Sequence, residues 1–178
     1  MVITIRKARP EDVPVLQVLI PESVRALQAE HYSAEQMEGA LGTVFGVDTQ
    51  LISDGTYFIA EAEGNIVGCG GWSRRKTLFG SDHVAGKDDA WLDPGVDAAR
   101  IRAFFIHPGW ARRGISSQIL RCCEAEAAAL GFSRLELVAT LTGEPLYRTR
   151  GFQATEHFEV PLANGAALPV IRMSKQVR

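Results

Sequence analysis

The chain has 178 residues, of which 46% are hydrophobic and 22% are charged, and its formal net charge is −2. This composition excludes wholesale disorder, collagen and a coiled coil, and the length fits one domain with a single sizeable core. The weak negative charge argues against a general nucleic-acid binder. The sequence has no apolar run of about 18 residues and no signal peptide, so we expect a cytoplasmic protein that binds no membrane.

Cysteine and histidine residues are few and scattered. The three cysteines, Cys69, Cys122 and Cys123, form no CxxC pair, and none of the four histidines stands in HxxxH spacing. We therefore predict neither a disulfide framework nor a metal site.

The N-terminal part predicts one strand followed by helices. Residues 2–6 alternate as a β-strand does. A helix follows from Pro10, with apolar residues at helical spacing, and Pro21 is interpreted as the start of a second helix. The capping-box pattern that begins at Ser33 predicts a further short helix that ends near Leu41.

Two apolar strands and a long loop come next. Residues 56–62 and 65–72 flank a Glu-Gly turn, which indicates a hairpin. Three glycines of the second strand mark a bulge or the close approach of another group: Gly68, Gly70 and Gly71. The polar stretch 73–98 is punctuated by Gly and Pro, and we interpret it as a long loop over a site.

The C-terminal half predicts strand, helix, strand, helix and a terminal hairpin. The ranges are 100–107, 114–130, 135–139, 144–150, and 152–160 with 167–173. Because helices and strands alternate without a linker or repeat, we expect residues 1–178 to form a single α/β domain with a mixed sheet.

One segment carries a chemical signal, namely the passage from the strand at 100–107 into the helix at 114–130. Arg112 and Arg113 add positive charge there, Gly114 permits a close approach, and Ser116 and Ser117 add hydroxyl groups. The first turn of a helix has unpaired N–H groups and a partial positive charge, so this junction suits a pyrophosphate-like anion. Neither a P-loop nor a GxGxxG motif is present. A solvated turn before a surface helix is the alternative.

The same segment resembles a known motif. The run Ile106-His107-Pro108-Gly109-Trp110-Ala111-Arg112-Arg113-Gly114-Ile115-Ser116 resembles the acyl-CoA-binding motif of the GNAT acetyltransferase superfamily. Downstream, Tyr147-Arg148-Thr149-Arg150-Gly151-Phe152 looks like the Tyr-x-x-x-Gly-Phe signature of that family, and the start of the chain is a weaker match. Ala111 departs from the usual Arg or Gln, and Ser116 from Gly or Ala. A cradle of backbone amides does not depend on those side chains.

The resemblance implies a fold and an activity. The fold would be a single-domain GNAT-like α/β fold, with a mixed, mostly antiparallel sheet of about six or seven strands, splayed at its centre and flanked by about four helices. Strand 100–107 would diverge from strand 135–139 and open a slot. The activity would be acetyl transfer from acetyl-CoA to an amine of a small molecule or peptide, by direct attack in a ternary complex.

The resemblance also implies roles for particular residues. Cofactor binding would fall to the backbone of Phe104, Phe105 and Ile106 and to Arg112, Arg113, Gly114, Ile115, Ser116 and Ser117. An amide N–H of Phe105 or Ile106 would stabilise the thioester oxyanion. The Tyr147 hydroxyl would donate a proton to the departing thiolate.

A general base is expected, and Glu61 is the first candidate because it ends a central strand. Other carboxylates and the tryptophans are further candidates for the base and for an acceptor pocket: Asp93, Asp97, Glu144, Trp72, Trp91 and Trp110. Surface carboxylates and buried aromatics are more often structural, so each of these residues also has a purely structural interpretation.

Three alternatives stay open. The chain could be a non-catalytic acyl-CoA-binding regulatory module on the same fold, or an unrelated α/β domain that binds another phosphate ligand. The acceptor could also be macromolecular, such as a protein N-terminus. Exposed strands and the terminal hairpin would allow a homodimer.

Overall fold

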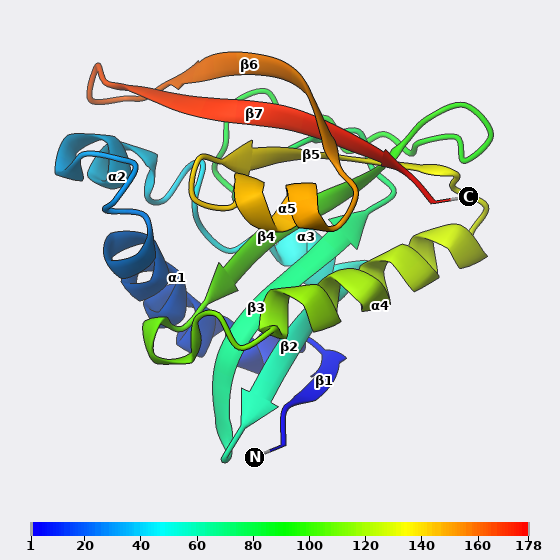
Figure 1. The fold of residues 1–178 in the computed structure, drawn as a ribbon, viewed down its shortest axis with the longest axis horizontal. Helices are drawn as coiled ribbons and strands as arrows, with labels where there is room; N and C mark the ends of the chain where they lie inside the picture. The colour runs from blue at the N-terminus through cyan, green and yellow to red at the C-terminus, as the bar shows by residue number, and fades with distance from the viewer. Residues whose placement is uncertain (1, 178) are drawn as a thin grey trace.

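The strand-forming segments gather into one sheet in the computed structural model, which describes residues 2–177 (Figure 1). Its seven strands within these residues are β1 (Thr4–Lys7), β2 (Tyr57–Ala62), β3 (Asn65–Ser73), β4 (Ala99–Ile106), β5 (Arg134–Thr140), β6 (Gln153–Pro161) and β7 (Ala167–Gln176). The five α-helices of the same residues are α1 (Val13–Leu27), α2 (Ala34–Ala40), α3 (Thr49–Ser53), α4 (Ile115–Ala129) and α5 (Glu144–Thr149). The expected mixed α/β fold is confirmed.

The sheet is splayed between its two central strands. The strand order is β1-β2-β3-β4-β5-β7-β6, and β4 with β5 is the parallel pair. These two strands share register only at Ala99 with Leu135 and at Arg100 with Glu136. Beyond that point β5 pairs with β7 through to Thr140, whereas β4 stays with β3. The predicted divergence of the two strands is therefore confirmed.

Helices cover both faces of the sheet. The apolar stripe of α4, with Ile115, Ile119 and Cys123, packs on one face together with Phe152, and Figure 1 shows α4 lying across β2 and β3. The apolar residues of α1, α2 and α3 pack on the opposite face with β2 and β3 residues such as Ile59. Burial on both faces explains why the central strands read as nearly continuous apolar runs.

The N-terminal helices differ from the prediction at two points. Pro21 does not start a second helix, because α1 runs unbroken from Val13 to Leu27. Proline removes one backbone donor, and the carbonyl that it leaves unpaired belongs to the exposed Gln17, where water can bind it. The short helix α3 was not predicted, and Asp48 caps it by accepting a hydrogen bond from the Gln50 amide at 3.0 Å.

A β-bulge divides β4 at Ala103. The register with β3 shifts between Cys69 and Gly71, and Ala103 has a left-handed backbone with φ of 58°. The Tyr57 hydroxyl donates a hydrogen bond to the Ala103 carbonyl at 2.6 Å, which holds this unfavourable conformation. A Cβ atom on Gly70 would lie 2.7 Å from the Phe104 ring, so the predicted close approach at this glycine is confirmed.

The bulge changes which face each β4 residue meets. Without it, Ile101 and Phe105 would lie on the same face, because side chains alternate along a strand. In the structure Ile101 packs in the cluster under α4, whereas Phe105 packs in the cluster under α1. Arg102 and Phe104 are also two residues apart and lie on opposite faces: Phe104 packs on the α4 face, whereas Arg102 reaches Asp48 before α3.

A buried ion pair ties β4 to the segment before α3. The Arg102 guanidinium donates to Asp48 at 2.7 Å, and both side chains are 2% exposed. Arg102 also donates to the Gly80 carbonyl at 2.7 Å, so it anchors the loop of residues 74–98, which forms neither a helix nor a multi-residue strand.

Among residues 2–177, no helix is long and apolar enough to cross a bilayer.

Replacing Asp48 with alanine should cost about 3–5 kcal/mol of unfolding free energy, because Arg102 would keep a buried charge without its partner. Glu38→Ala is the matched control, since it breaks an exposed ion pair with Arg25 and should leave stability near that of the wild type. Urea denaturation of both variants measures the difference. Equal stabilities of the two variants would contradict the assignment.

Candidate active site

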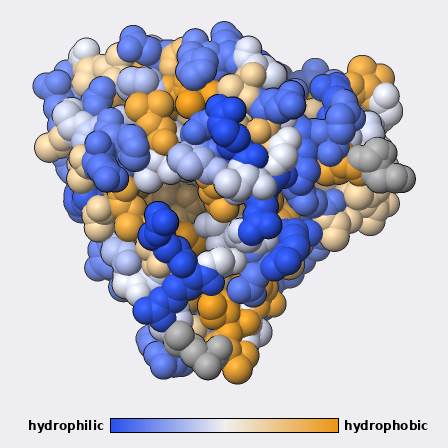
Figure 2. Space-filling view, viewed as in Figure 1, coloured by the Kyte–Doolittle hydropathy of each residue, from blue (hydrophilic) through white to orange (hydrophobic). Residues whose placement is uncertain are grey.

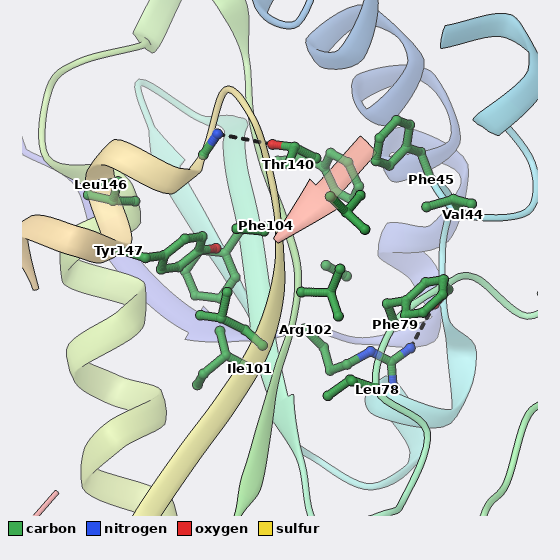
Figure 3. Close-up of a pocket in the computed structure, with 18 of the residues that line it drawn as sticks. Val44, Phe45, Leu78, Phe79, Ile101, Arg102, Phe104, Thr140, Leu146 and Tyr147 are labelled. Carbon is green, nitrogen blue, oxygen red and sulfur yellow. Dashed lines mark hydrogen bonds between the residues drawn. The ribbon is translucent and has the colours of Figure 1, made fainter. Parts of the chain in front are cut away.

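The divergence of β4 and β5 opens a cavity of about 150 Å³ that passes between the two faces of the sheet. On the α4 face it is lined by Ser116, Leu146 and Tyr147. On the α1 face it is lined by residues that Figure 3 shows on the opposite side of the strands, including Phe45 and Phe79. Figure 2 shows a hollow with a hydrophobic floor near the middle of the viewed face. Two ligands could therefore meet between the strands from opposite sides.

Tyr147 lies at the α4 side of this cavity. Its ring packs edge-on against Phe104, with ring centroids 6.2 Å apart, and against Phe152 at 5.7 Å. Figure 3 shows the side chain extending from α5 toward the strands. Burial raises the pKa of the Tyr147 hydroxyl, so it stays protonated at neutral pH. The hydroxyl has no hydrogen-bond partner within residues 2–177, which leaves it able to serve a ligand.

The edge of β4 that leaves β5 presents backbone groups. The His107 amide donates to Val67 of β3 at 2.9 Å, so by the alternation of an antiparallel ladder the Phe105 amide also faces β3. The Ile106 amide faces the other way and donates to the Ser23 hydroxyl at 3.2 Å. Of the two amides named as oxyanion donors, the geometry thus favours Ile106.

The N-terminus of α4 forms a turn with two left-handed residues. Arg112 has φ of 62° and Gly114, the N-cap, has φ of 80°. Left-handed residues alternating with right-handed ones turn successive N–H groups into a concave anion site. Arg112, Arg113 and Gly114 are exposed, and the Arg113 guanidinium stacks 4.7 Å from the centre of the Trp110 ring.

Two residues predicted to bind cofactor are buried at the start of α4. Ile115 is 2% exposed and belongs to the core under this helix. The Ser117 hydroxyl accepts a hydrogen bond from Arg150 at 3.1 Å and is 5% exposed as a residue. Their side chains position the helix, and only their backbone amides remain available to an anion.

Glu61 is not brought to the cavity. It lies in β2 opposite Thr4, and its carboxylate pairs with Arg6 at 3.1 Å. The other candidate bases also serve local structure, since Asp93 accepts from the Gly95 amide at 2.9 Å and Glu144 pairs with Arg148. The geometry therefore places none of these predicted carboxylates where it could deprotonate an amine in the cavity.

The three tryptophans also lie away from the cavity. Trp72 is buried and donates to Glu126 at 2.9 Å, whereas Trp91 is exposed under the guanidinium groups of Arg74 and Arg75. Trp110 lies beneath Arg113. These are packing roles.

Most residues on the α1 side of the cavity come from the two segments in which the sequence predicts the acceptor pocket, 13–45 and 73–98: Gln28, Val44, Phe45, Leu78 and Phe79. The sequence singled out none of them individually, because no motif spacing links them. Arg102 of β4 lies outside both segments and was assigned no role. Among residues 2–177, no group of three or more potential metal ligands occurs.

Comparisons with known proteins agree with this architecture. A model of the acetyltransferase (GNAT) domain matches residues 53–154. None of the curated proteins compared with the chain matches it significantly.

Solved structures share the fold along nearly the whole chain. A GCN5-related N-acetyltransferase from Rhodopseudomonas palustris is 24% identical, with a TM-score of 0.72 over 99% of this chain and 98% of that one. The PaiA N-acetyltransferase of Thermoplasma acidophilum, solved with coenzyme A, is 16% identical, with a TM-score of 0.66 over 99% of both chains. YncA of Salmonella typhimurium, solved with its cofactor acetyl-CoA, is 17% identical, with a TM-score of 0.66 over 100% of this chain and 95% of that one.

The family model spans both the bulged strand β4 and the turn before α4, which are the parts that shape the cavity. Because this model covers more than half of the sequence, the chain belongs to the GNAT family of acetyltransferases.

Proposed function

We propose that residues 1–178 act as one catalytic domain, which transfers an acetyl group from acetyl-CoA to a primary amine. The observation that carries the proposal is the cavity between β4 and β5, which is lined by residues from both faces of the sheet and has Tyr147 at one side. A donor on the α4 face and an acceptor on the α1 face would meet in it without a covalent enzyme intermediate. Similar folds hold coenzyme A in PaiA and acetyl-CoA in YncA, which supports this donor.

Acetyl-CoA would bind in two parts. The pyrophosphate would lie at the amides from Arg112 to Ser117, where the helix dipole and two arginines favour negative charge. The pantetheine arm would follow the edge of β4 at Phe104 to Ile106 and pair with it as an added strand would. This path leads the thioester to the cavity, where Ser116 and Tyr147 are lining residues.

The chemical step would be a direct attack. The neutral amine nitrogen forms a bond to the thioester carbon, and the bond from that carbon to sulfur breaks. The Ile106 amide would stabilise the oxyanion by a hydrogen bond. The oxyanion would then replace the Ser23 hydroxyl as the acceptor for this amide. The sulfur leaves as a thiolate and receives the Tyr147 proton. The nitrogen loses one proton to solvent, and Tyr147 regains one proton from solvent, so the number of protons balances.

Acetyl-CoA at about 100 times its dissociation constant should raise the melting temperature by about 5–10 °C, because binding to the native state alone adds about 2.7 kcal/mol. A thermal-shift assay with acetyl-CoA, CoA and ADP measures this. CoA should match acetyl-CoA, and ADP should give a smaller shift because it lacks the pantetheine arm. Equal shifts with ADP would instead favour a generic phosphate site, and no shift would remove the proposal.

Replacing Tyr147 with phenylalanine should lower kcat by about 10²–10⁴, because the thiolate would leave without its proton donor. The affinity for acetyl-CoA and the unfolding free energy should stay near those of the wild type, since the hydroxyl has no partner among the described residues.

Tyr32→Phe is the structural control for this variant. The Tyr32 hydroxyl donates to the Pro169 carbonyl at 2.6 Å and accepts from the Leu141 amide at 2.9 Å, so its removal should cost about 1 kcal/mol of stability. A Tyr147→Phe enzyme that is as active as the wild type would contradict the role of Tyr147 as proton donor, whereas a wild type that binds acetyl-CoA but acetylates no amine would favour the non-catalytic alternative.

The rate should not fall on the alkaline side of the pH profile up to about pH 10. The reason is that burial raises the pKa of Tyr147 above about 10, the ordinary pKa of a phenol. In the same range kcat/KM should rise with pH as the acceptor amine loses its proton. Initial rates from about pH 6 to pH 10 measure both effects. A fall in rate between about pH 8 and pH 9 would show that Tyr147 is not the acid.

A further inference from the structure

The second half of β5 has a strand on one side only. In the sheet, β5 lies between β4 and β7. Its pairing with β7 runs to Thr140, whereas its pairing with β4 ends at Glu136. From there to its end, β5 presents one backbone edge to the gap between the strands. A free strand edge is a row of N–H and C=O groups that can pair with another extended chain.

The ladder with β7 shows which residues supply the groups of this edge. The Val177 amide donates to the Ser133 carbonyl at 2.8 Å, and these two residues stand opposite each other one step before the first pair of the β5–β7 register. Because hydrogen-bonded residues alternate along an antiparallel ladder, every second residue after Ser133 points its amide and carbonyl toward β7. Val138 and Thr140 therefore point theirs toward the gap, where these groups have no partner within residues 2–177.

The free edge lies beside the proposed reacting centre. Val138 and Thr140 both line the cavity. The Thr140 hydroxyl accepts a hydrogen bond from the Gly143 amide at 3.0 Å (Figure 3). A Cβ atom on Gly143 would lie 3.3 Å from that hydroxyl oxygen and 3.5 Å from the Tyr147 ring, so the end of β5 is close to the side chain that would protonate the thiolate.

The cavity offers little charge to a ligand. Arg102 is the one charged residue among the described residues that line it, and it is 3% exposed and paired with Asp48. A free amino acid would leave its carboxylate without an accessible cation there, and a polyamine would leave its distant ammonium groups without a carboxylate. Because desolvating an unpaired charge is costly, the lining favours an acceptor that is neutral around its amine.

Apolar side chains flank the free edge on the α1 face. Val138 packs in the cluster under α1, and the facing wall of the cavity is formed by Val44, Phe45, Leu78 and Phe79 (Figure 3). A free backbone edge beside an apolar wall suits an extended peptide, since main-chain hydrogen bonds hold the peptide and the wall receives its side chains.

We propose that the acceptor is the free N-terminus of an extended polypeptide segment with a small, uncharged first residue, a proposal that rests on the function proposed above and specifies its substrate class. The segment lies beside β5 as an added strand, and its amides and carbonyls pair with those of Val138 and Thr140. The first side chain is small because the cavity of about 150 Å³ also admits the acetyl thioester.

Each substrate then has a strand of its own. The pantetheine arm follows the edge of β4, and the peptide follows the edge of β5. The N-terminal nitrogen forms the bond to the acetyl carbon, with bonds and protons exchanged as in the step above. The products are the N-acetylated peptide and CoA.

Three acceptors test this class on the wild-type protein: tri-L-alaninamide, L-alaninamide and L-alanine. After acetyl-CoA binding has been measured by calorimetry, release of the CoA thiol gives kcat/KM for each acceptor, expressed per neutral amine because the pKa values of the amines differ. We expect the tripeptide amide to exceed both others by at least about tenfold, because it alone is long enough to pair as a strand. Equal or better use of L-alaninamide or L-alanine, or turnover of none of the three, would overturn the proposal.

Methylation of single peptide nitrogens tests the strand pairing. Successive amides of a strand point to opposite sides, so only one of the second and third residues of the tripeptide can donate to β5. N-methylation of that residue should lower kcat/KM by about three- to tenfold, and methylation of the other is the matched control for added bulk. Equal effects at both positions, or no effect at either, would contradict the pairing.

Val138→Pro removes an amide of the free edge and leaves the ladder with β7 in place, because that amide takes no part in it. The KM for tri-L-alaninamide should rise by about three- to tenfold with acetyl-CoA affinity unchanged. His157→Pro is the matched control, since His157 is exposed in the edge strand β6 and its amide points away from β7, and it should leave KM unchanged. An unchanged KM in Val138→Pro would overturn the pairing with β5.

The outcomes separate this proposal from the function on which it rests. Failure of acetyl-CoA to bind the wild type would remove the proposed function itself. Binding and turnover without a preference for the tripeptide amide would remove only the acceptor class. If Val138→Pro does not fold, the three acceptors and the methylated peptides still decide.

Discussion

The bulge at Ala103 in β4 is the constraint on which the site depends. One extra residue, held by the hydrogen bond from Tyr57 to the Ala103 carbonyl, shifts the alternation of side chains within a single strand. Arg102 therefore faces the segment before α3, and Phe104 faces Tyr147. The same strand supplies a wall to both sides of the cavity, and its bend allows β5 to leave it after two register pairs.

Positive charge is exposed on one face and buried on the other, and this difference would divide the work between donor and acceptor. The turn before α4 has helix N–H groups and two exposed arginines, which would bind the phosphates of a cofactor in the proposed function. On the other face, a single guanidinium is buried and mostly satisfied by Asp48 and by carbonyls of the long loop. An exposed cluster of charge attracts a highly charged ligand, whereas an apolar wall selects a small group by its shape.

Local patterns predicted most of the fold and part of the site. The helix after Gly114, the hairpin around residue 64 and the strand that contains Phe104 follow from periodicity and turn residues, because those signals depend on neighbours in the chain. Pro21 misled the prediction, since tertiary packing of Leu19, Ile20 and Val24 keeps α1 continuous through a proline. Glu61 seemed suitable as a base by its place in a strand, yet its pairing with Arg6 depends on how β1 lies beside β2.

Sequence patterns alone predict the order of the elements, an anion-binding turn before α4 and the family resemblance that singled out Tyr147. Each of these depends on residues close together in the chain. The meeting of Gln28, Phe79 and Arg102 in one cavity could not be predicted in this way, because they come from a helix end, a loop and a strand that the sheet brings together. The same holds for the free edge of β5, since the pairing of a strand depends on neighbours distant in sequence.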